Sequence, residues 1–210
     1  MYTPDFNSMT DRQEMVDFMK RYAFAVLITA KNGIPRASHL PFCVSETNGE
    51  LRLTAHFAKA NTHWQELEDH PVLALFSGPH AYISPISYEE GPNVPTWNYL
   101  AVHALGHCKI ALDTAETLRI LEEIIGQHEI PFQQEWDAYP EAYRMGMVRG
   151  VVAFTMTVTD LQGKKKLSQN RTPNEQRRIV EVLSKSEDSL VRDLAAYMAI
   201  GRADTPQEQG

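Results

Sequence analysis

The chain has 210 residues, 43% of them hydrophobic, and a formal net charge of −7. That length and apolar fraction suffice for one large domain with its own core and exclude a chain that is disordered throughout. Cys43 and Cys108 lie far apart in apolar runs, which predicts reduced, buried thiols in a cytoplasmic protein. The N-terminus has no signal-peptide pattern and the longest apolar run is too short for a bilayer, so we expect no membrane association.

The first half of the chain has the pattern of one helix followed by short strands and tight turns. Thr10 and Gln13 fit a capping box that predicts a helix over 11–21. Asn-Gly pairs at Asn32 and Asn48 predict β-hairpins. The predicted strands are 23–30, 34–44, 51–57, 72–78 and 81–84, with a short helix over 61–70.

The second half alternates one long strand, helices and another strand. We expect a strand over 96–112 with a bulge or bend at Gly106. A helix capped by Asp113 follows and ends near 127. The sequence Thr172-Pro173-Asn174-Glu175 has the features of a helix start, namely cap, proline and capping glutamate. The other predicted elements are helices over 138–147, 173–185 and 186–200, a strand over 150–161, and a disordered tail over 203–210.

These elements predict a mainly β protein of the α+β class. Hairpin-linked strands without βαβ alternation favour a β-barrel over a sandwich or a doubly wound sheet. The last two helices predict a C-terminal α-hairpin. We therefore expect a barrel domain over 1–162, and a basic segment with a helical hairpin over 163–202.

Several well-known chemical motifs are absent from the sequence. There is no GxGxxG, Walker loop, GxSxG or CxxC, which argues against a Rossmann dinucleotide site and against P-loop chemistry. His103 and His107 have a spacing that binds metal on a helix, but their context predicts a strand. Four strand residues span about 13 Å, too far for one ion, so we expect no metal site. Nothing marks a catalytic nucleophile.

Two short stretches carry candidate binding residues. His56, Lys59 and Asn61 cluster where a strand ends and a helix begins, a place that suits an anion, although a solvated loop has the same pattern. Trp97 and Asn98 lie on opposite faces of the long strand. They suit either plain packing or an amide that hydrogen-bonds a planar heterocycle.

The segment GKKKLSQNRTP, residues 163–173, gathers four cations. Three interpretations remain open: a solvated loop, contact with the phosphate of a cofactor, or contact with DNA. The following hairpin mixes acidic and basic side chains, whereas a recognition helix is usually more basic. An acidic chain also repels DNA at long range.

Six blocks of the sequence together carry a family resemblance: MYTPDFN at the N-terminus, SHLPF (38–42), HFAKAN (56–61), ALFSGPHAYISP (74–85), VPTWNYLAVHALG (94–106) and KLSQNR (166–171). With these blocks the sequence resembles the PaiB-type proteins, described as FMN-binding negative transcriptional regulators. The resemblance runs through almost the whole chain, although the loop at YISPISYEEGPNVP departs from the family pattern. It implies an FMN-binding split β-barrel, a homodimer, and FMN bound in a groove between subunits.

The resemblance also implies roles for individual residues. The residues along the flavin ring or its phosphate would be Arg36, Ser38, His39 and Leu40, and those that hold the phosphate would be His56, Lys59 and Asn61. The residues that approach from the other subunit would be Trp97 and Asn98. The segment that closes over the cofactor would contribute Lys166, Ser168 and Gln169.

Two other functions stay open at this point. A flavin-dependent oxidoreductase of the NAD(P)H:flavin reductase type needs a nicotinamide site that the sequence does not display, so we expect weak turnover or none. A haem-binding split barrel is the less favoured alternative, because relatives of that kind use a histidine near the C-terminus and the last histidine here is His128.

Overall fold

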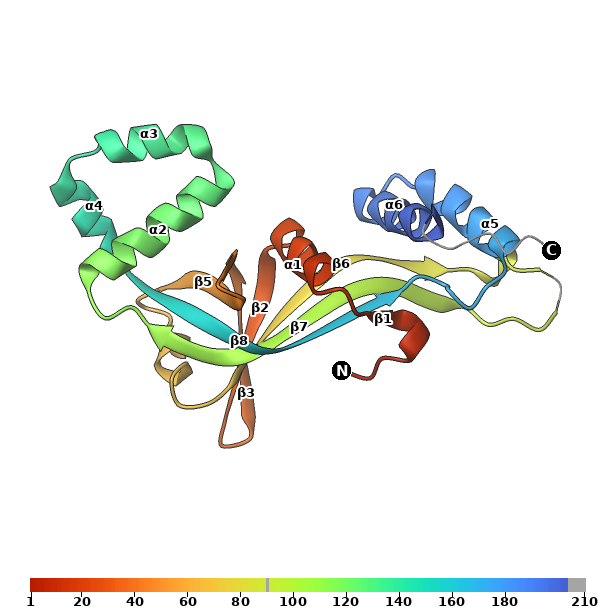
Figure 1. The fold of residues 1–210 in the computed structure, drawn as a ribbon, viewed down its shortest axis with the longest axis horizontal. Coiled ribbons are helices and arrows are strands. Elements are labelled where there is room, and N and C mark those ends of the chain that lie inside the picture. The colour runs from red at the N-terminus through yellow and green to blue at the C-terminus, as the bar shows by residue number, and fades with distance from the viewer. Residues whose placement is uncertain (90, 204–210) are drawn as a thin grey trace. The chain divides into compact units, whose positions relative to one another are not determined.

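The computed structural model describes residues 1–89 and 91–203, so positions 204–210 of the expected tail lie outside the described residues. Its centre is an eight-stranded sheet in the order β3-β2-β6-β7-β8-β5-β4, with β1 paired to β8 (Figure 1). The predicted α+β class is confirmed. The strands are β1 (Ser8–Met9), β2 (Phe24–Lys31), β3 (Ile34–Pro41), β4 (Cys43–Thr47), β5 (Glu50–Ala58), β6 (Val72–Ile83), β7 (Thr96–Ile110) and β8 (Val151–Lys166).

Six α-helices and three short 3₁₀ helices accompany the sheet in the described part of the chain. None of the described helices is long and apolar enough to span a membrane. The helices are η1 (Asp5–Asn7), α1 (Arg12–Arg21), η2 (Thr62–Glu66), η3 (Pro85–Ser87), α2 (Thr114–His128), α3 (Ile130–Ala138), α4 (Glu141–Val148), α5 (Pro173–Ser184) and α6 (Ser189–Ala203).

The tight turns form where the Asn-Gly pairs predicted them. Asn32 and Gly33 have φ angles of 54° and 77°, and Asn48 and Gly49 have 54° and 79°. Two successive left-handed residues match the twist of a hairpin, and Asn and Gly adopt that conformation most easily. The β2–β3 and β4–β5 hairpins are therefore confirmed as local features of the sequence.

Several predicted boundaries were wrong. The strand expected over 34–44 breaks at Phe42, which is fully buried and whose N–H donates to the carbonyl of Ala23 at 2.9 Å. The two strands expected over 72–84 form one strand, β6. Strand β8 continues to Lys166, and Gly163 and Lys164 within it pair with β1, so the lysine run is a strand and not a loop.

The helix predictions also need corrections. The Asp11 carboxylate, and not Thr10, accepts the N–H of Gln13 at 2.7 Å at the start of α1. Helix η2 is only one turn long where a helix over 61–70 was predicted. Helix α3 was missed, and α6 begins at Ser189 rather than at 186. The predicted capping box of Thr172 and Glu175 is confirmed at the start of α5.

The chain divides into two compact units. One unit comprises residues 15–76 and 102–162, and we call it the barrel unit. The other comprises the described residues of 1–14, 77–101 and 163–203, and we call it the C-terminal unit. Strands β6, β7 and β8 each contribute residues to both units, so neither unit is a continuous stretch of sequence.

Aromatic side chains form the core of the barrel unit. The ring of Phe42 lies 5.7 Å from Phe76 and 6.2 Å from Phe154, and Phe57 lies 5.5 Å from Phe154. All four rings are fully buried. Such rings bury large apolar areas, and pairs at these distances add a modest attraction of their own. In the same unit α2 packs on β5 and carries α3 and α4 beside it (Figure 1).

Gly106 on β7 lies directly against the backbone of Thr157 on β8. A Cβ at this position would come within 2.1 Å of the carbonyl oxygen of Thr157, which is backbone and cannot swing away. Gly106 thus makes a close backbone contact that only glycine permits. The bulge or bend predicted at this position stays a prediction.

We expect Gly106→Ala to lower the free energy of unfolding by about 1–3 kcal/mol, the usual cost of overpacking. Gly146 in helix α4 has open space around its Cβ position and is the matched control. Gly146→Ala should leave stability unchanged or raise it by up to about 1 kcal/mol, because alanine favours helices. Urea unfolding of the two variants and the parent measures the difference, and equal midpoints for both variants would contradict this account.

Candidate functional site

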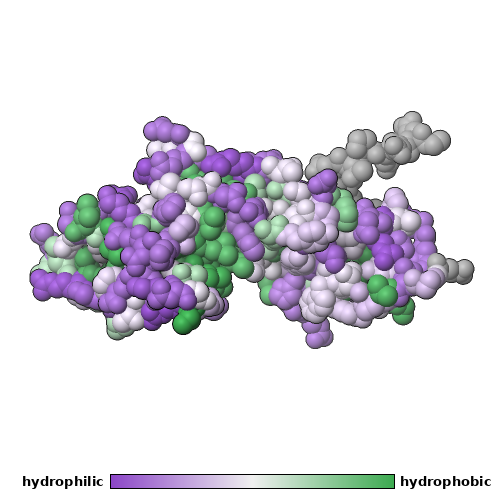
Figure 2. All heavy atoms as spheres, turned by 90° about the horizontal axis from the view of Figure 1, so that it is seen from below, coloured by the Kyte–Doolittle hydropathy of each residue, from purple (hydrophilic) through white to green (hydrophobic). Residues whose placement is uncertain are grey.

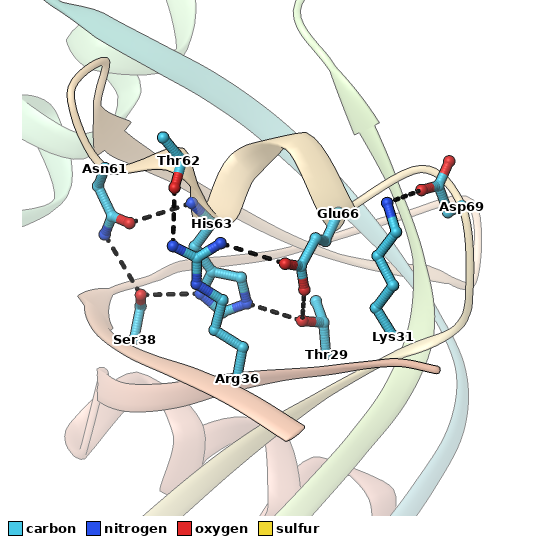
Figure 3. Close-up of polar contacts among 9 residues, drawn as sticks. All are labelled: Thr29, Lys31, Arg36, Ser38, Asn61, Thr62, His63, Glu66 and Asp69. Carbon is cyan, nitrogen blue, oxygen red and sulfur yellow. Dashed lines mark hydrogen bonds and ion pairs between the residues drawn. The ribbon is translucent and has the colours of Figure 1, made fainter. Parts of the chain in front are cut away.

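A polar cluster in the barrel unit joins strands β2 and β3 to helix η2 (Figure 3). At its centre is His63, a fully buried side chain. Its ring packs edge-on against Phe57, with 5.5 Å between the ring centroids. A buried imidazole is costly unless its polar atoms are hydrogen-bonded, so its partners define the site.

Both ring nitrogens of His63 have hydroxyl partners. Nε2 lies 2.9 Å from Oγ1 of Thr29, and Nδ1 lies 2.8 Å from Oγ of Ser38. The Asn61 side chain joins the cluster, because its Nδ2 donates to Ser38 Oγ at 3.3 Å and its Oδ1 accepts the backbone N–H of His63 at 3.1 Å. Burial lowers the pKa of His63, and the nearby charge of Arg36 adds to that effect.

An ion pair closes the other side of the cluster. Arg36 donates through Nη1 to Oε1 of Glu66 at 3.1 Å and through Nη2 to Oγ1 of Thr62 at 2.7 Å. Thr29 donates its hydroxyl to the other carboxylate oxygen of Glu66 at 2.7 Å. This hydrogen bond, followed by the contact with Arg36, lowers the pKa of Glu66, which is therefore ionised at neutral pH.

The structure thus brings three predicted site residues, Arg36, Ser38 and Asn61, into one cluster. Their neighbours His63 and Glu66 were missed by the sequence analysis, as were Thr29 and Thr62. Thr29 had a detectable signal, because it follows Ala25 and Leu27 at the inward positions of β2. A polar residue at an inward position needs a partner. His63 and Glu66 had no such signal, since their segment has the pattern of an ordinary acidic helix.

The remaining predicted residues of the barrel unit lie on β3 and β5 or just after β5. His39 is exposed and stacks near Phe24, with 6.1 Å between ring centroids, whereas Leu40 is buried. His56 has a buried Nδ1 without a partner among the described residues. Burial lowers the pKa of His56, so its ring is neutral at neutral pH.

Lys59 follows β5 and is exposed. Its backbone N–H donates to the carbonyl of Gly150 at 2.8 Å, and its own carbonyl accepts the indole N–H of Trp64 at 3.1 Å. Hydrogen bonds to the backbone N–H and to the carbonyl of Lys59 therefore hold this loop in place. Within residues 1–89 and 91–203 the Lys59 ammonium has no hydrogen bond or ion pair.

The other predicted site residues belong to the C-terminal unit. Asn98 is completely buried and donates to Ser168 Oγ at 2.9 Å, while that hydroxyl donates back to Asn98 Oδ1 at 3.2 Å. Ser168 holds a left-handed conformation, with φ of 62°. Trp97 is 52% exposed and lies beside the rings of His80 and Tyr82.

The basic segment is bound within its own unit. Lys164 is buried, donates to the carbonyl of Tyr2 at 3.0 Å and lies over the ring of Tyr99. Lys165 pairs with Glu14 at 2.7 Å. Lys166 donates to the hydroxyl of Thr96.

The last cation of the segment is also engaged. Arg171 donates to Asn93 at 2.9 Å and stacks over Tyr88, with 3.7 Å between the guanidinium carbon and the ring centroid. The exposed side chain of Gln169 accepts the N–H of Leu167 at 2.7 Å and donates to the carbonyl of Lys165. All four cations of GKKKLSQNR are therefore in contact with other groups of the chain, which is not the solvated loop that the sequence left open.

The cysteines do not add a nucleophile to the site. Both thiols are free and buried, as predicted. Burial raises the pKa of Cys43 to about 11 and that of Cys108 to about 12. At neutral pH both are thiols and not thiolates, and the thiolate is the reactive form.

The fold is that of flavin-binding split-barrel proteins. The flavocytochrome Anf3 from Azotobacter vinelandii matches with a TM-score of 0.59 and 15% identity, over 76% of this chain and 69% of that protein. The FAD and heme binding protein from Mycobacterium smegmatis matches with a TM-score of 0.61 and 12% identity, over 81% of this chain and 78% of that protein. At such identities the likeness shows the fold alone, and it confirms the predicted split barrel.

Sequence comparison narrows the class to one family. The chain belongs to the PaiB-type family of FMN-binding proteins: residues 1–160 match the family described as "Putative FMN-binding domain". It is 34% identical over 202 residues to the protease synthase and sporulation protein PAI 2 of Bacillus subtilis, covering 94% of this chain and 96% of that protein. An uncharacterized protein of Emericella nidulans is 33% identical over 175 residues, covering 64% of this chain and 69% of that protein.

The family membership and the predicted cofactor, FMN, are confirmed by these matches. The donor set of the barrel unit fits that cofactor. Among the residues that the structure describes, neither the Lys59 ammonium nor the buried Nδ1 of His56 has a partner, and Arg36 has further N–H groups beyond the two it uses. Cations suit a phosphate, and polar side chains suit the edge of a flavin ring.

Proposed function

We propose that this chain is a homodimeric FMN-binding module that takes part in negative control of transcription, as its family resemblance implies. The observation that carries the proposal is the polar cluster around Arg36, Ser38 and Asn61, close in sequence to the unpartnered Lys59. Bound FMN supplies the capacity to take up or release a hydride. The residues of the chain bind and orient the cofactor.

We assign Lys59 to the FMN phosphate. Both backbone groups of Lys59 are hydrogen-bonded, so the position of its Cα is held while its side chain extends freely. The guanidinium of Arg36 is a second candidate for the phosphate, but its charge is already balanced by Glu66. Lys59 therefore offers the larger uncompensated charge to an anion.

Lys59→Ala should weaken FMN binding by about 1.5–3 kcal/mol, the range for a hydrogen bond to a charged group. Binding of riboflavin, which has no phosphate, should be unchanged. Fluorescence titration measures both affinities. Lys109→Ala is the matched control, because Lys109 is also exposed and without a partner among the described residues. Equal affinities of the parent and Lys59→Ala for FMN would place the phosphate elsewhere.

We propose further that any control of transcription does not use the basic segment 164–171 to bind DNA. A phosphate contact needs a cation that is free to replace a counterion. Lys164, Lys165, Lys166 and Arg171 are each engaged by groups of their own unit. A flavin-linked route or a protein partner is then the means by which the chain acts.

Gel-shift titrations at about 50 mM salt, where non-specific electrostatic binding is strong, should show no retarded band. Both the FMN-loaded and the FMN-free protein should be tested on the DNA upstream of its own gene and on unrelated DNA. The double variant Arg177→Ala, Arg178→Ala removes two exposed cations of α5. A band that weakens steeply with salt and disappears in this variant would show direct DNA contact through that helix.

The proposed homodimer is supported by exposed aromatic side chains in the C-terminal unit. Trp97 and Tyr82 are 52% and 51% exposed. Figure 2 shows that other, aliphatic or strongly hydrophobic side chains are also exposed between hydrophilic ones on one face of the molecule. Exposed clusters of large apolar groups are typical of interfaces. We propose that Trp97 of each subunit approaches the flavin of the other, whereas the amide of Asn98 is already engaged by Ser168.

Light scattering coupled to size exclusion should give twice the chain mass of 23.8 kDa at micromolar concentration. Trp97→Ala should lower the fraction of dimer or the affinity for FMN. Trp136→Phe serves as a comparison for the loss of a tryptophan, because the Trp136 indole contacts Glu122 of α2 and none of the proposed FMN residues. A single-chain mass with FMN bound at full occupancy would contradict the dimer.

A further inference from the structure

The geometry points to one direction for every hydrogen bond around His63. We infer that this makes Ser38 a hydrogen-bond acceptor toward the ligand, which therefore meets an N–H or O–H group of the flavin and not its phosphate. The inference rests on the proposed function, because it assigns a part of FMN to one residue of that site. It also names Thr29, His63 and Glu66 as positioning residues that act on Ser38.

The direction is set at one end by Glu66. Its carboxylate is ionised and can only accept, so Thr29 must give its single hydroxyl proton to it across 2.7 Å. The Thr29 oxygen is then left to accept from Nε2 of His63 at 2.9 Å. Nε2 of His63 therefore carries a proton.

The other ring nitrogen follows from this assignment. Burial lowers the pKa of His63, so the ring is neutral at neutral pH and holds only one proton. Nδ1 consequently has a lone pair, and the hydroxyl of Ser38 donates to it across 2.8 Å. The one proton of Ser38 is thus directed into the protein and away from a ligand.

Asn61 sets the direction at the other end. Its Oδ1 accepts the backbone N–H of His63, and this contact decides which end of the amide is nitrogen. Nδ2 then faces Ser38 and donates to its Oγ at 3.3 Å. The chain of donations runs from Asn61 through Ser38, His63 and Thr29 to Glu66, without a conflict at any step.

Ser38 has one acceptor position left after these two contacts. A hydroxyl oxygen has two lone pairs, of which Asn61 occupies one. The side chain is only half-buried, so a ligand can reach it. A phosphate monoester above its second pKa of about 6 carries only acceptor oxygens, and two acceptors repel. The imide N–H of the flavin ring and the ribityl hydroxyls are the donors that fit.

Protonation of His63 would reverse this preference. Both ring nitrogens would then donate, and Ser38 would have to turn its proton toward the ligand. Two charged groups act on His63: the Arg36 guanidinium disfavours protonation, and the Glu66 carboxylate favours it. Burial is the largest effect and also disfavours protonation. The acceptor state is therefore the one present at neutral pH, and it is lost only as pH falls through the lowered pKa of His63.

The test compares Ser38→Ala with the parent in fluorescence titrations with FMN and with riboflavin at neutral pH. We expect a loss of roughly 3-fold to 10-fold in affinity, typical of one neutral hydrogen bond, and the same factor for both ligands. Ser45→Ala on β4 is the control, because Ser45 takes no part in the cluster. A loss for FMN alone would place Ser38 at the phosphate and overturn the inference, and so would an unchanged affinity for both ligands.

A second measurement uses the unaltered chain without ligand. Nitrogen-15 NMR of the histidine ring distinguishes the two neutral tautomers, and His63 should carry its proton on Nε2. A proton on Nδ1 would overturn the inference even if FMN binds. Failure to bind FMN or riboflavin at all would instead remove the proposed function, and the tautomer measurement keeps the two outcomes apart. The variant His63→Gln identifies the His63 resonance by its disappearance. In the parent, riboflavin affinity should fall when low pH protonates His63, and in the folded variant this pH dependence should be absent.

Discussion

The arrangement of the barrel unit depends on satisfying a completely buried histidine. His63 has no contact with solvent, so both ring nitrogens need partners within the protein, and each unmade bond would cost about 1–3 kcal/mol. The partners come from three places: Thr29 on β2, Ser38 on β3 and Asn61 before η2. The hydrogen bonds of His63 attach η2 to the β2–β3 hairpin, and both Arg36 and Ser38 face η2 from β3 (Figure 3).

In the C-terminal unit the groups that need partners are the cations Lys164 and Arg171. A buried lysine is tolerated only when its charge is compensated, and Lys164 has a carbonyl and the faces of two tyrosine rings. Arg171 is compensated by Asn93, by the ring of Tyr88 and by Glu175 at 3.8 Å. Lys164 attaches β8 to the N-terminal segment and to β7, and Arg171 attaches the turn after β8 to residues 88–93 and to α5. Their charge is therefore used by the fold.

The polar residues of the barrel unit and those of the C-terminal unit therefore differ in how many hydrogen-bonding groups they leave for a ligand. In the barrel unit the polar side chains keep unused capacity: the ammonium of Lys59, the remaining N–H groups of Arg36 and one lone pair of Ser38. In the C-terminal unit the amide of Asn98 and the hydroxyl of Ser168 are used by each other. Unused donors and acceptors near a surface are what a cofactor requires, which favours the barrel unit as the place of the proposed contacts.

The sequence by itself determined the features that depend on neighbouring residues. The Asn-Gly turns, the capping box at Thr172 and Glu175 and the apolar run of β2 are short-range patterns, and the structure contains each of them. The family blocks also identified the class of protein and its cofactor. The tertiary structure alone decided which polar residues meet. His63 lies 34 residues from Thr29 and 25 from Ser38, and no local pattern reports such distances. The lysine run was likewise not recognised as a strand, because the strands that β8 lies beside, β1 and β7, are far from it in sequence.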